Sequence, residues 1–204
     1  MKFIKWKSLI ITSIFCILPI LLGVFLWDKL PESIAIHFNI NNEPDNFASK
    51  GFAVFCLPLL MLFLQAFCCI TNDFNSHKYG EHKKLETATK WIIPIMSIVL
   101  QTITLLYSLG RNIDIRKSVL IIIGLIFVVT GKYLPELDYI KNYDLEIKKA
   151  RKINKFIGFG MVIMGLLAVL SVFLPPIASV LWLILLIPYT AISIIYAIKV
   201  SSKK

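Results

Sequence analysis

The residues of this chain that could do chemistry are gathered in three short polar segments between long apolar runs. The first segment runs from Leu30 to Lys50, and from Ser33 to Asn41 it alternates strictly between apolar and polar residues. Such alternation is typical of a β-strand with one buried face. The polar face and the turn after it offer groups suited to binding, and the candidate binding residues are His37, Asn39, Glu43, Pro44 and Asp45.

The two faces of this predicted strand have different expected roles. The apolar face should pack on helices or lipid, and its members are Ile34, Ile36, Phe38 and Ile40. His37 and Asn39 should point away from that face. A histidine can titrate near neutral pH or bind a metal, but no second ligand stands at metal-binding spacing. We therefore predict a surface histidine that is hydrogen-bonded within its own loop.

The second polar segment places Asp73, His77 and Glu81 four residues apart, with His82 next to the last of them. On a helix such a row lies on one face and could bind a divalent metal. Gly80 interrupts the row, and the surrounding lysines would repel a cation. The sequence therefore favours a solvated charged loop here, and it predicts neither a metal site nor a cofactor.

The third polar segment, residues 131–155, ends in a cluster of basic residues, namely Lys148, Lys149, Arg151, Lys152 and Lys155. Basic residues beside an apolar run attract anionic lipid headgroups at ~1 kcal/mol each near the surface. The same cluster could equally dock an acidic patch on a cytoplasmic regulator. The expected partners are thus the lipid bilayer alone, or the bilayer together with a regulator.

The elements that must position these segments follow from composition. Of 204 residues, 57% are hydrophobic and 17% are charged, and the mean hydropathy is +0.77. These values indicate an integral membrane protein and exclude a soluble enzyme, a disulfide-stapled secreted domain and a disordered tail. The four cysteines lie inside apolar runs without a CxxC motif, so neither a disulfide framework nor a Cys-based metal site is expected. The net charge of +10 is interpreted as a topology signal rather than as direct nucleic-acid binding.

Five apolar runs are long enough to cross a bilayer as helices, and a sixth, shorter run does so if Lys132 extends its charged end to the membrane surface. They are Ser8–Trp27, Phe52–Thr71, Trp91–Leu109, Ser118–Leu134, Phe156–Leu174 and Ile177–Ile198. Six spans put both termini on one side, and 17 of the 22 Lys and Arg residues fall on that side against 5 on the other. The positive-inside rule then predicts a multi-pass protein of the cell membrane with both termini in the cytoplasm. The expected fold is an all-α integral membrane protein with a short strand-like extracellular loop after the first helix.

Two three-span regions are predicted, residues 1–110 with the outer loop 28–51, and residues 111–204. The span interiors contain no Asp, Glu, Arg or His, and ion-coupled transporters and intramembrane hydrolases usually need such a group at depth. Gln65 and Gln101 are the main polar groups inside the spans, and we expect them to hydrogen-bond to neighbouring helices. A catalytic or ion-coupled mechanism is disfavoured.

Three stretches resemble a known family. The stretch from Leu30 to Gly51, with its Leu-Pro, Ile, His, Asn, Pro-Asp and Ser-Lys-Gly in order, resembles the domain of unknown function that opens SdpI-type immunity proteins. Gly131–Pro135 resembles the family's Gly-Asn-Tyr-Leu-Pro element, and Arg151–Gly158 resembles its entry into the fifth span. In the first stretch Ala35 stands where the family commonly has proline, and Asn42 where it has glycine.

The resemblance implies protection of a producing bacterium from its own secreted toxic peptide, and in the founding member also the binding of a cytoplasmic repressor. We therefore expect a non-enzymatic membrane protein that confers immunity to, or senses, a membrane-active toxic peptide by binding it at the outer face. One alternative is a small-molecule or peptide transporter or exporter subunit. Another is an accessory protein of an uncharacterised membrane enzyme, using His37 or the Asp73 row.

Overall fold

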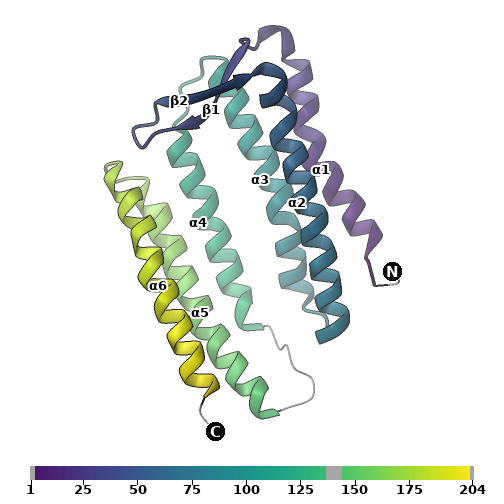
Figure 1. Cartoon of the computed structure of the whole chain (residues 1–204), viewed down its shortest axis with the longest axis vertical. Helices are drawn as coiled ribbons and strands as arrows, with labels where there is room; N and C mark the ends of the chain where they lie inside the picture. Colours follow the sequence, from purple (N-terminus) through teal and green to yellow (C-terminus); the bar gives the residue numbers. More distant parts are fainter. Residues whose placement is uncertain (1–2, 137–143, 203–204) are drawn as a thin grey trace. The chain divides into compact units, whose positions relative to one another are not determined.

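Six long helices and one short hairpin make up the fold in the computed structural model, which describes residues 3–136 and 144–202 (Figure 1). The helices are α1 (Trp6–Phe25), α2 (Lys50–Tyr79), α3 (Lys83–Ser108), α4 (Ile115–Tyr133), α5 (Asp144–Ser171) and α6 (Ile177–Ser201). All six are long and apolar enough to cross a membrane. The predicted all-α fold with six spans is thus confirmed, and the chain is a multi-pass membrane protein.

Helices α2 and α3 extend well beyond the apolar runs that predicted them. The second span was expected to end at Thr71, but α2 continues to Tyr79, and α3 begins at Lys83 rather than at Trp91. Gly80 ends α2 with a φ of 111°, a conformation that favours glycine after a helix. The prediction of a solvated charged loop from Asp73 onward is therefore wrong, because most of that segment is helical.

The chain folds as two compact units. The first comprises residues 1–74 and 89–119, and the second comprises residues 75–88 and 120–204. The first unit holds α1, most of α2 and α3, and the hairpin. Its core lies where the hairpin meets the helices, and the buried residues there are Leu30, Ile34, Ala53, Val54 and Leu105.

The second unit is built around a close approach of α4 and α5. A Cβ atom on Gly124 would lie 2.7 Å from the backbone oxygen of Gly165, and one on Gly131 would lie 2.5 Å from that of Gly158. Helix α6 is joined to α5 by the indole of Trp182, which donates to the carbonyl of Met164 at 2.8 Å. The tight backbone approach explains why small residues stand at these positions.

The hairpin consists of β1 (Ser33–Phe38) and β2 (Pro44–Ser49), paired antiparallel. The strand predicted from alternation is therefore present, but the pairing shifts register between Ala35 and His37, as at a β-bulge. A bulge inserts an extra residue and breaks the two-residue period. As a result Ile34 and its neighbour Ala35 are both buried, whereas Ile36 is 43% exposed.

The predicted strict alternation of faces is consequently wrong at Ala35, which is buried beside Ile34 although alternation places it on the polar face. Ile40 lies outside the strand and is 51% exposed. The predicted exposure is confirmed for His37, whose side chain is 67% exposed, whereas Asn39 lies beyond the end of β1 and is partly buried. The bulge is the physical reason for the difference, since alternation predicts burial only where the strand pairing is regular.

Candidate functional site

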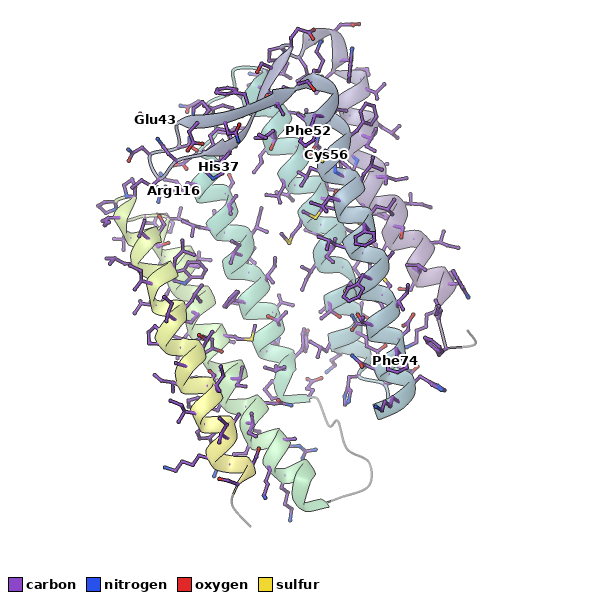
Figure 2. All side chains as sticks on the ribbon, viewed as in Figure 1. His37, Glu43, Phe52, Cys56, Phe74 and Arg116 are labelled. Atoms are coloured by element: carbon purple, nitrogen blue, oxygen red, sulfur yellow. The ribbon has the colours of Figure 1, made fainter. Side chains whose placement is uncertain are left out.

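The hairpin carries a cross-strand pair of titratable side chains. Nδ1 of His37 on β1 lies 2.5 Å from Oδ1 of Asp45 on β2. Both side chains are substantially exposed, at 67% and 43%. The predicted hydrogen-bonded surface histidine is thus confirmed, and its partner is another residue of the predicted binding set. Figure 2 shows His37 and Glu43 on the hairpin.

Asn39 organises the turn between the strands. Its side-chain oxygen accepts hydrogen bonds from the backbone N–H groups of Asn41 (2.9 Å) and Glu43 (3.0 Å). Its amide nitrogen donates to Oε2 of Glu43 at 2.8 Å. Side-chain to backbone bonds of this kind are how asparagine replaces secondary structure in turns. Asn39 therefore has a structural role in addition to any role in binding.

Asn42 fixes the turn to the beginning of α4. Its φ of 65° is left-handed, which asparagine tolerates better than most residues. Its Oδ1 accepts from the backbone N–H of Ile115 at 2.7 Å, and its Nδ2 donates to the carbonyl of Ile113 at 3.2 Å. The side chain thereby satisfies a free N–H at the helix N-terminus from a distant part of the chain. These hydrogen bonds tie the turn of the hairpin to the N-terminus of α4.

The base of the hairpin is anchored by a nearly buried lysine. Nζ of Lys50 lies 2.8 Å from Oε1 of Glu32 and donates to the carbonyl of Trp27 at 3.2 Å. It also lies 5.3 Å from the centre of the Trp27 ring, within the range of a cation–π contact. The exposed end of the hairpin carries the carboxylates of Asp45, which pairs with His37, and of Glu43, which accepts from Asn39. It offers mainly hydrogen-bond acceptors and suits a ligand rich in donors or positive charge.

A second polar cluster lies among α1, α2 and α3 within the first unit. The carboxylate of Asp73 forms an ion pair with Lys90, and the two side chains are 0% and 5% exposed. The other carboxylate oxygen accepts from the backbone N–H of Lys5 at 2.8 Å. Sequence reasoning missed this pair, because Asp73 and Lys90 stand just outside the apolar runs used to define the spans.

The two buried glutamines join helices, as the sequence predicted. Nε2 of Gln65 donates to Oγ1 of Thr12 on α1 (2.7 Å) and to the carbonyl of Lys90 on α3 (2.9 Å). Nε2 of Gln101 on α3 donates to the carbonyl of Ala53 on α2 at 3.0 Å. The prediction of hydrogen bonds between neighbouring spans is confirmed for both residues.

The predicted basic cluster lies on the N-terminal half of α5 rather than in a loop. Four of its members are exposed, namely Lys148, Arg151, Lys152 and Lys155. Lys149 is partly buried, and its Nζ lies 3.4 Å from the carbonyl of Ser201 near the end of α6. Part of the predicted docking loop, residues 137–143, lies outside the described residues.

Comparison with known proteins finds two similarities. Residues 14–62 match the family model for a domain of unknown function, DUF1648. The chain is also 27% identical over 175 residues to Immunity protein SdpI of Bacillus subtilis (strain 168), a match that covers 82% of this chain and 83% of that protein. The chain is thus similar to an SdpI-type immunity protein over most of its length. No solved structure matches it significantly.

The DUF1648 match covers the hairpin, residues 14–25 of α1 and residues 50–62 of α2. Asn42 lies inside the matched range, but its partners Ile113 and Ile115 lie far outside it. The sequence signal for its role was an asparagine at a turn where the family commonly has glycine, since both residues tolerate left-handed backbone. A carboxylate and a lysine that flank consecutive apolar runs, as Asp73 and Lys90 do, were the available signal for the buried pair.

Proposed function

We propose that this SdpI-like protein confers immunity to, or senses, a membrane-active toxic peptide by binding it at the hairpin without catalysis. The observation that carries the proposal is the exposed pair His37–Asp45 on a hairpin held to α4 by Asn42. A surface that is exposed and held in place loses little conformational entropy on binding. The similarity to Immunity protein SdpI over most of both chains supports the same role.

The proposal places the hairpin outside the cell and both termini in the cytoplasm. The support is the distribution of Lys and Arg, 17 on the side of the termini and 5 on the side of the hairpin. A toxic peptide that arrives from the medium would then meet the hairpin first. The acceptor-rich surface formed by Glu43 and Asp45 favours a peptide that carries positive charge or exposed donors.

The geometry of the hairpin supports peptide binding better than it supports catalysis. Nucleophilic catalysis needs a hydroxyl or thiol within hydrogen-bond reach of a base. Among the described residues, His37 is hydrogen-bonded to Asp45 and to no hydroxyl or thiol. The accessory-enzyme alternative has no further support in this arrangement.

The proposal is tested by expressing the full chain in a sensitive bacterium and challenging the cells with the membrane-active peptide encoded beside its gene. A binder is titrated by its target, so resistance should rise with the amount of protein and be overcome by excess peptide. The variant His37→Ala/Asp45→Ala should lose protection at equal membrane abundance. Lys29→Ala, an exposed change outside the proposed binding set, should keep it.

Two results would overturn this proposal. Absence of protection by the wild type against the co-encoded peptide would remove the immunity role. Steady loss of intact peptide from the medium, even when the peptide outnumbers the protein, would replace binding with catalysis.

Transport is the second candidate function, favoured by the buried Asp73–Lys90 pair. Ionisable groups inside a membrane protein often mark an ion or substrate path. However, Asp73 lies within two turns of the end of α2, and Lys90 lies within two turns of the beginning of α3. Transporter sites usually lie near the middle of the membrane instead. Peptide accumulation in inverted vesicles that is abolished by Asp73→Asn at equal abundance of folded protein would favour transport over immunity by binding.

We also propose that the exposed basic residues of α5 contact anionic lipid or a cytoplasmic regulator. Four exposed cations on one helix next to the bilayer support either partner. Reversing the charge of Arg151 and Lys152 should weaken binding to anionic lipid and binding to the regulator. Capture of a soluble protein by the wild type in vesicles that lack anionic lipid, and its loss in this variant, would identify the regulator.

A further inference from the structure

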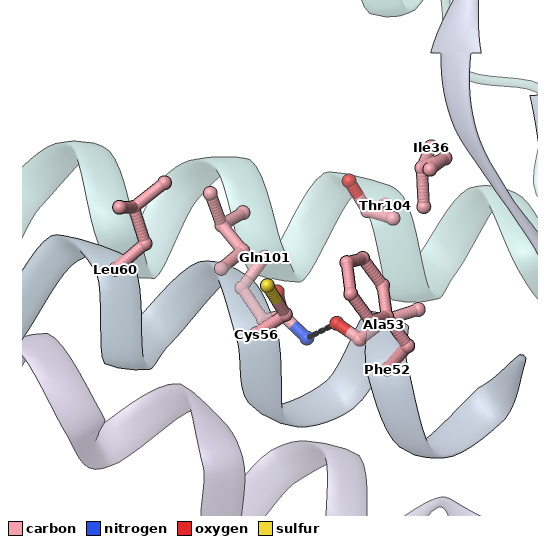
Figure 3. A pocket seen from close by; sticks show the side chains of 8 residues that line it. Ile36, Phe52, Ala53, Cys56, Leu60, Gln101 and Thr104 are labelled. Atoms are coloured by element: carbon pink, nitrogen blue, oxygen red, sulfur yellow. Dashed lines mark hydrogen bonds between the residues drawn. The ribbon is translucent and has the colours of Figure 1, made fainter. Parts of the chain in front are cut away.

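A small apolar pocket lies beside the hairpin within the first unit (Figure 3). Its volume is about 210 Å³. The lining comes from α2, α3 and the bulge of β1, with Phe52, Cys56, Leu60, Gln101, Thr104 and Ile36 as the main contributors. The β-bulge places Ile36 here instead of in the core, so the break in alternation helps to shape the pocket.

One polar atom in this lining has no partner. Gln101 is completely buried, and its amide nitrogen is held by the carbonyls of Ala53 (3.0 Å) and Val54 (3.4 Å). This bonding fixes which end of the amide is oxygen, because only the nitrogen can donate to carbonyls. The remaining atom, Oε1, is a buried acceptor without a hydrogen bond among the described residues. Buried polar atoms are nearly always paired, so an unpaired one needs an explanation.

The pocket and the acceptor together define a ligand chemistry. Pockets for drug-sized molecules measure roughly 300 to 1,000 Å³, so the space here suits a single side chain. An apolar lining with one acceptor is complementary to an apolar group that carries one donor. The indole of tryptophan has that form, and tryptophan is frequent both at binding hot spots and at membrane interfaces.

We propose that this pocket receives a tryptophan side chain of the membrane-active peptide, with the indole N–H donating to Oε1 of Gln101. The inference rests on the proposed function and adds an anchoring site to it. The exposed pair His37–Asp45 contacts polar parts of the peptide, and the pocket holds one aromatic side chain. Oε1 is inaccessible to solvent in the structure, so binding includes the movement of at least one neighbouring side chain.

The test uses the purified full-length protein in detergent and a native thiol as reporter. Cys56 lines the pocket, whereas Cys68 lies farther along α2, outside the lining, and is likewise partly buried. N-ethylmaleimide alkylation of each cysteine is followed by mass spectrometry with increasing N-acetyl-tryptophanamide. We expect the probe to slow alkylation of Cys56 severalfold and to leave Cys68 unchanged.

Two further probes distinguish the contribution of the indole N–H from that of the aromatic ring. N-acetyl-1-methyltryptophanamide keeps the ring and lacks the N–H, and it should need a roughly 2- to 10-fold higher concentration for the same protection, the usual effect of one hydrogen bond. N-acetyl-phenylalaninamide should also protect less. Equal protection by all three probes would mean a purely apolar site, such as one for a lipid chain, and would overturn the assignment, as would no protection.

Substitutions give an independent comparison. Gln101→Met removes the acceptor at similar length, so the two indole probes should then protect Cys56 equally. The matched control is Gln65→Met, because Gln65 is also completely buried with an unpaired Oε1 but lies outside the pocket lining. Gln65→Met should preserve the difference between the probes. If Gln101→Met does not fold, the probe comparison on the wild type decides.

The measurement needs neither toxin nor resistance. A negative alkylation result therefore overturns the pocket assignment and leaves the proposed immunity role standing. A failed resistance assay, in contrast, removes the proposed function without changing which probe protects Cys56.

Discussion

The side chain of Asn42 caps α4 from the hairpin turn, with its Oδ1 2.7 Å from the backbone nitrogen of Ile115. This one contact joins the strands that follow α1 to the helix that follows α3. It makes the position of the exposed pair His37–Asp45 dependent on a residue far away in sequence. The contact therefore has consequences for stability as well as for binding.

The first prediction concerns this cap. Asn42→Gly keeps access to the left-handed backbone but removes the acceptor, and should lower the free energy of unfolding by about 1 kcal/mol, the usual net effect of losing one hydrogen bond. Asn42→Ala should lower it further, because alanine is also strained at a φ of 65°. Denaturant unfolding in detergent measures both changes. Asn41→Ala, at the exposed neighbouring position, is the control, and an equal loss for it would contradict the cap.

The second prediction concerns the buried ion pair. Asp73→Asn should destabilise the protein by about 3–5 kcal/mol, because it leaves Lys90 buried and unpaired. The double variant Asp73→Leu/Lys90→Met should regain much of that loss, since apolar pairs often replace buried ion pairs without penalty. Thermal unfolding of the single and double variants gives the comparison.

An exposed pair provides the matched control for the second prediction. Lys84 and Glu136 are 4.0 Å apart and 71% and 49% exposed. Lys84→Ala should change the free energy of unfolding by less than about 1 kcal/mol. Similar effects for Lys84→Ala and Asp73→Asn would show that burial of Asp73 does not matter.

The third prediction concerns the approach of α4 to α5. Gly124→Val should reduce membrane abundance strongly, because a Cβ atom there already meets the Gly165 carbonyl oxygen at 2.7 Å. Gly51→Ala should be neutral, since the nearest atom to its Cβ is 3.8 Å away. Quantitative blotting of membranes compares the two, and normal abundance of Gly124→Val would mean that the helices are not in close contact.

The fourth prediction tests orientation. After replacement of the native cysteines, a cysteine at position 41 or 112 should react with an impermeant thiol reagent in intact cells, and one at position 84 should not. The physical reason is the excess of basic residues on the side of the termini, 17 against 5. Labelling at position 84 without permeabilisation would reverse or break the proposed topology.

The sequence by itself determined the class of fold, the six spans and the presence of a strand after α1. These features depend on the length of an apolar run or on local alternation. Both are properties of consecutive residues and do not depend on contacts with distant parts of the chain. The exposed position of His37 followed in the same way. The candidate binding set came from residue types within one loop, and its use in binding stays a prediction.

Only the tertiary structure decided the contacts between distant residues. Asp73 and Lys90 are 17 residues apart, and Asn42 and Ile115 are 73 apart, so no local pattern links the members of either pair. The bulge at Ile36 likewise depends on pairing with β2, which the alternation of a single strand does not encode. Whether a charged side chain is buried, or which face of a strand a side chain lies on, depends on the segment packed against it. These features therefore followed only from the tertiary structure, in which the helices and the hairpin pack together.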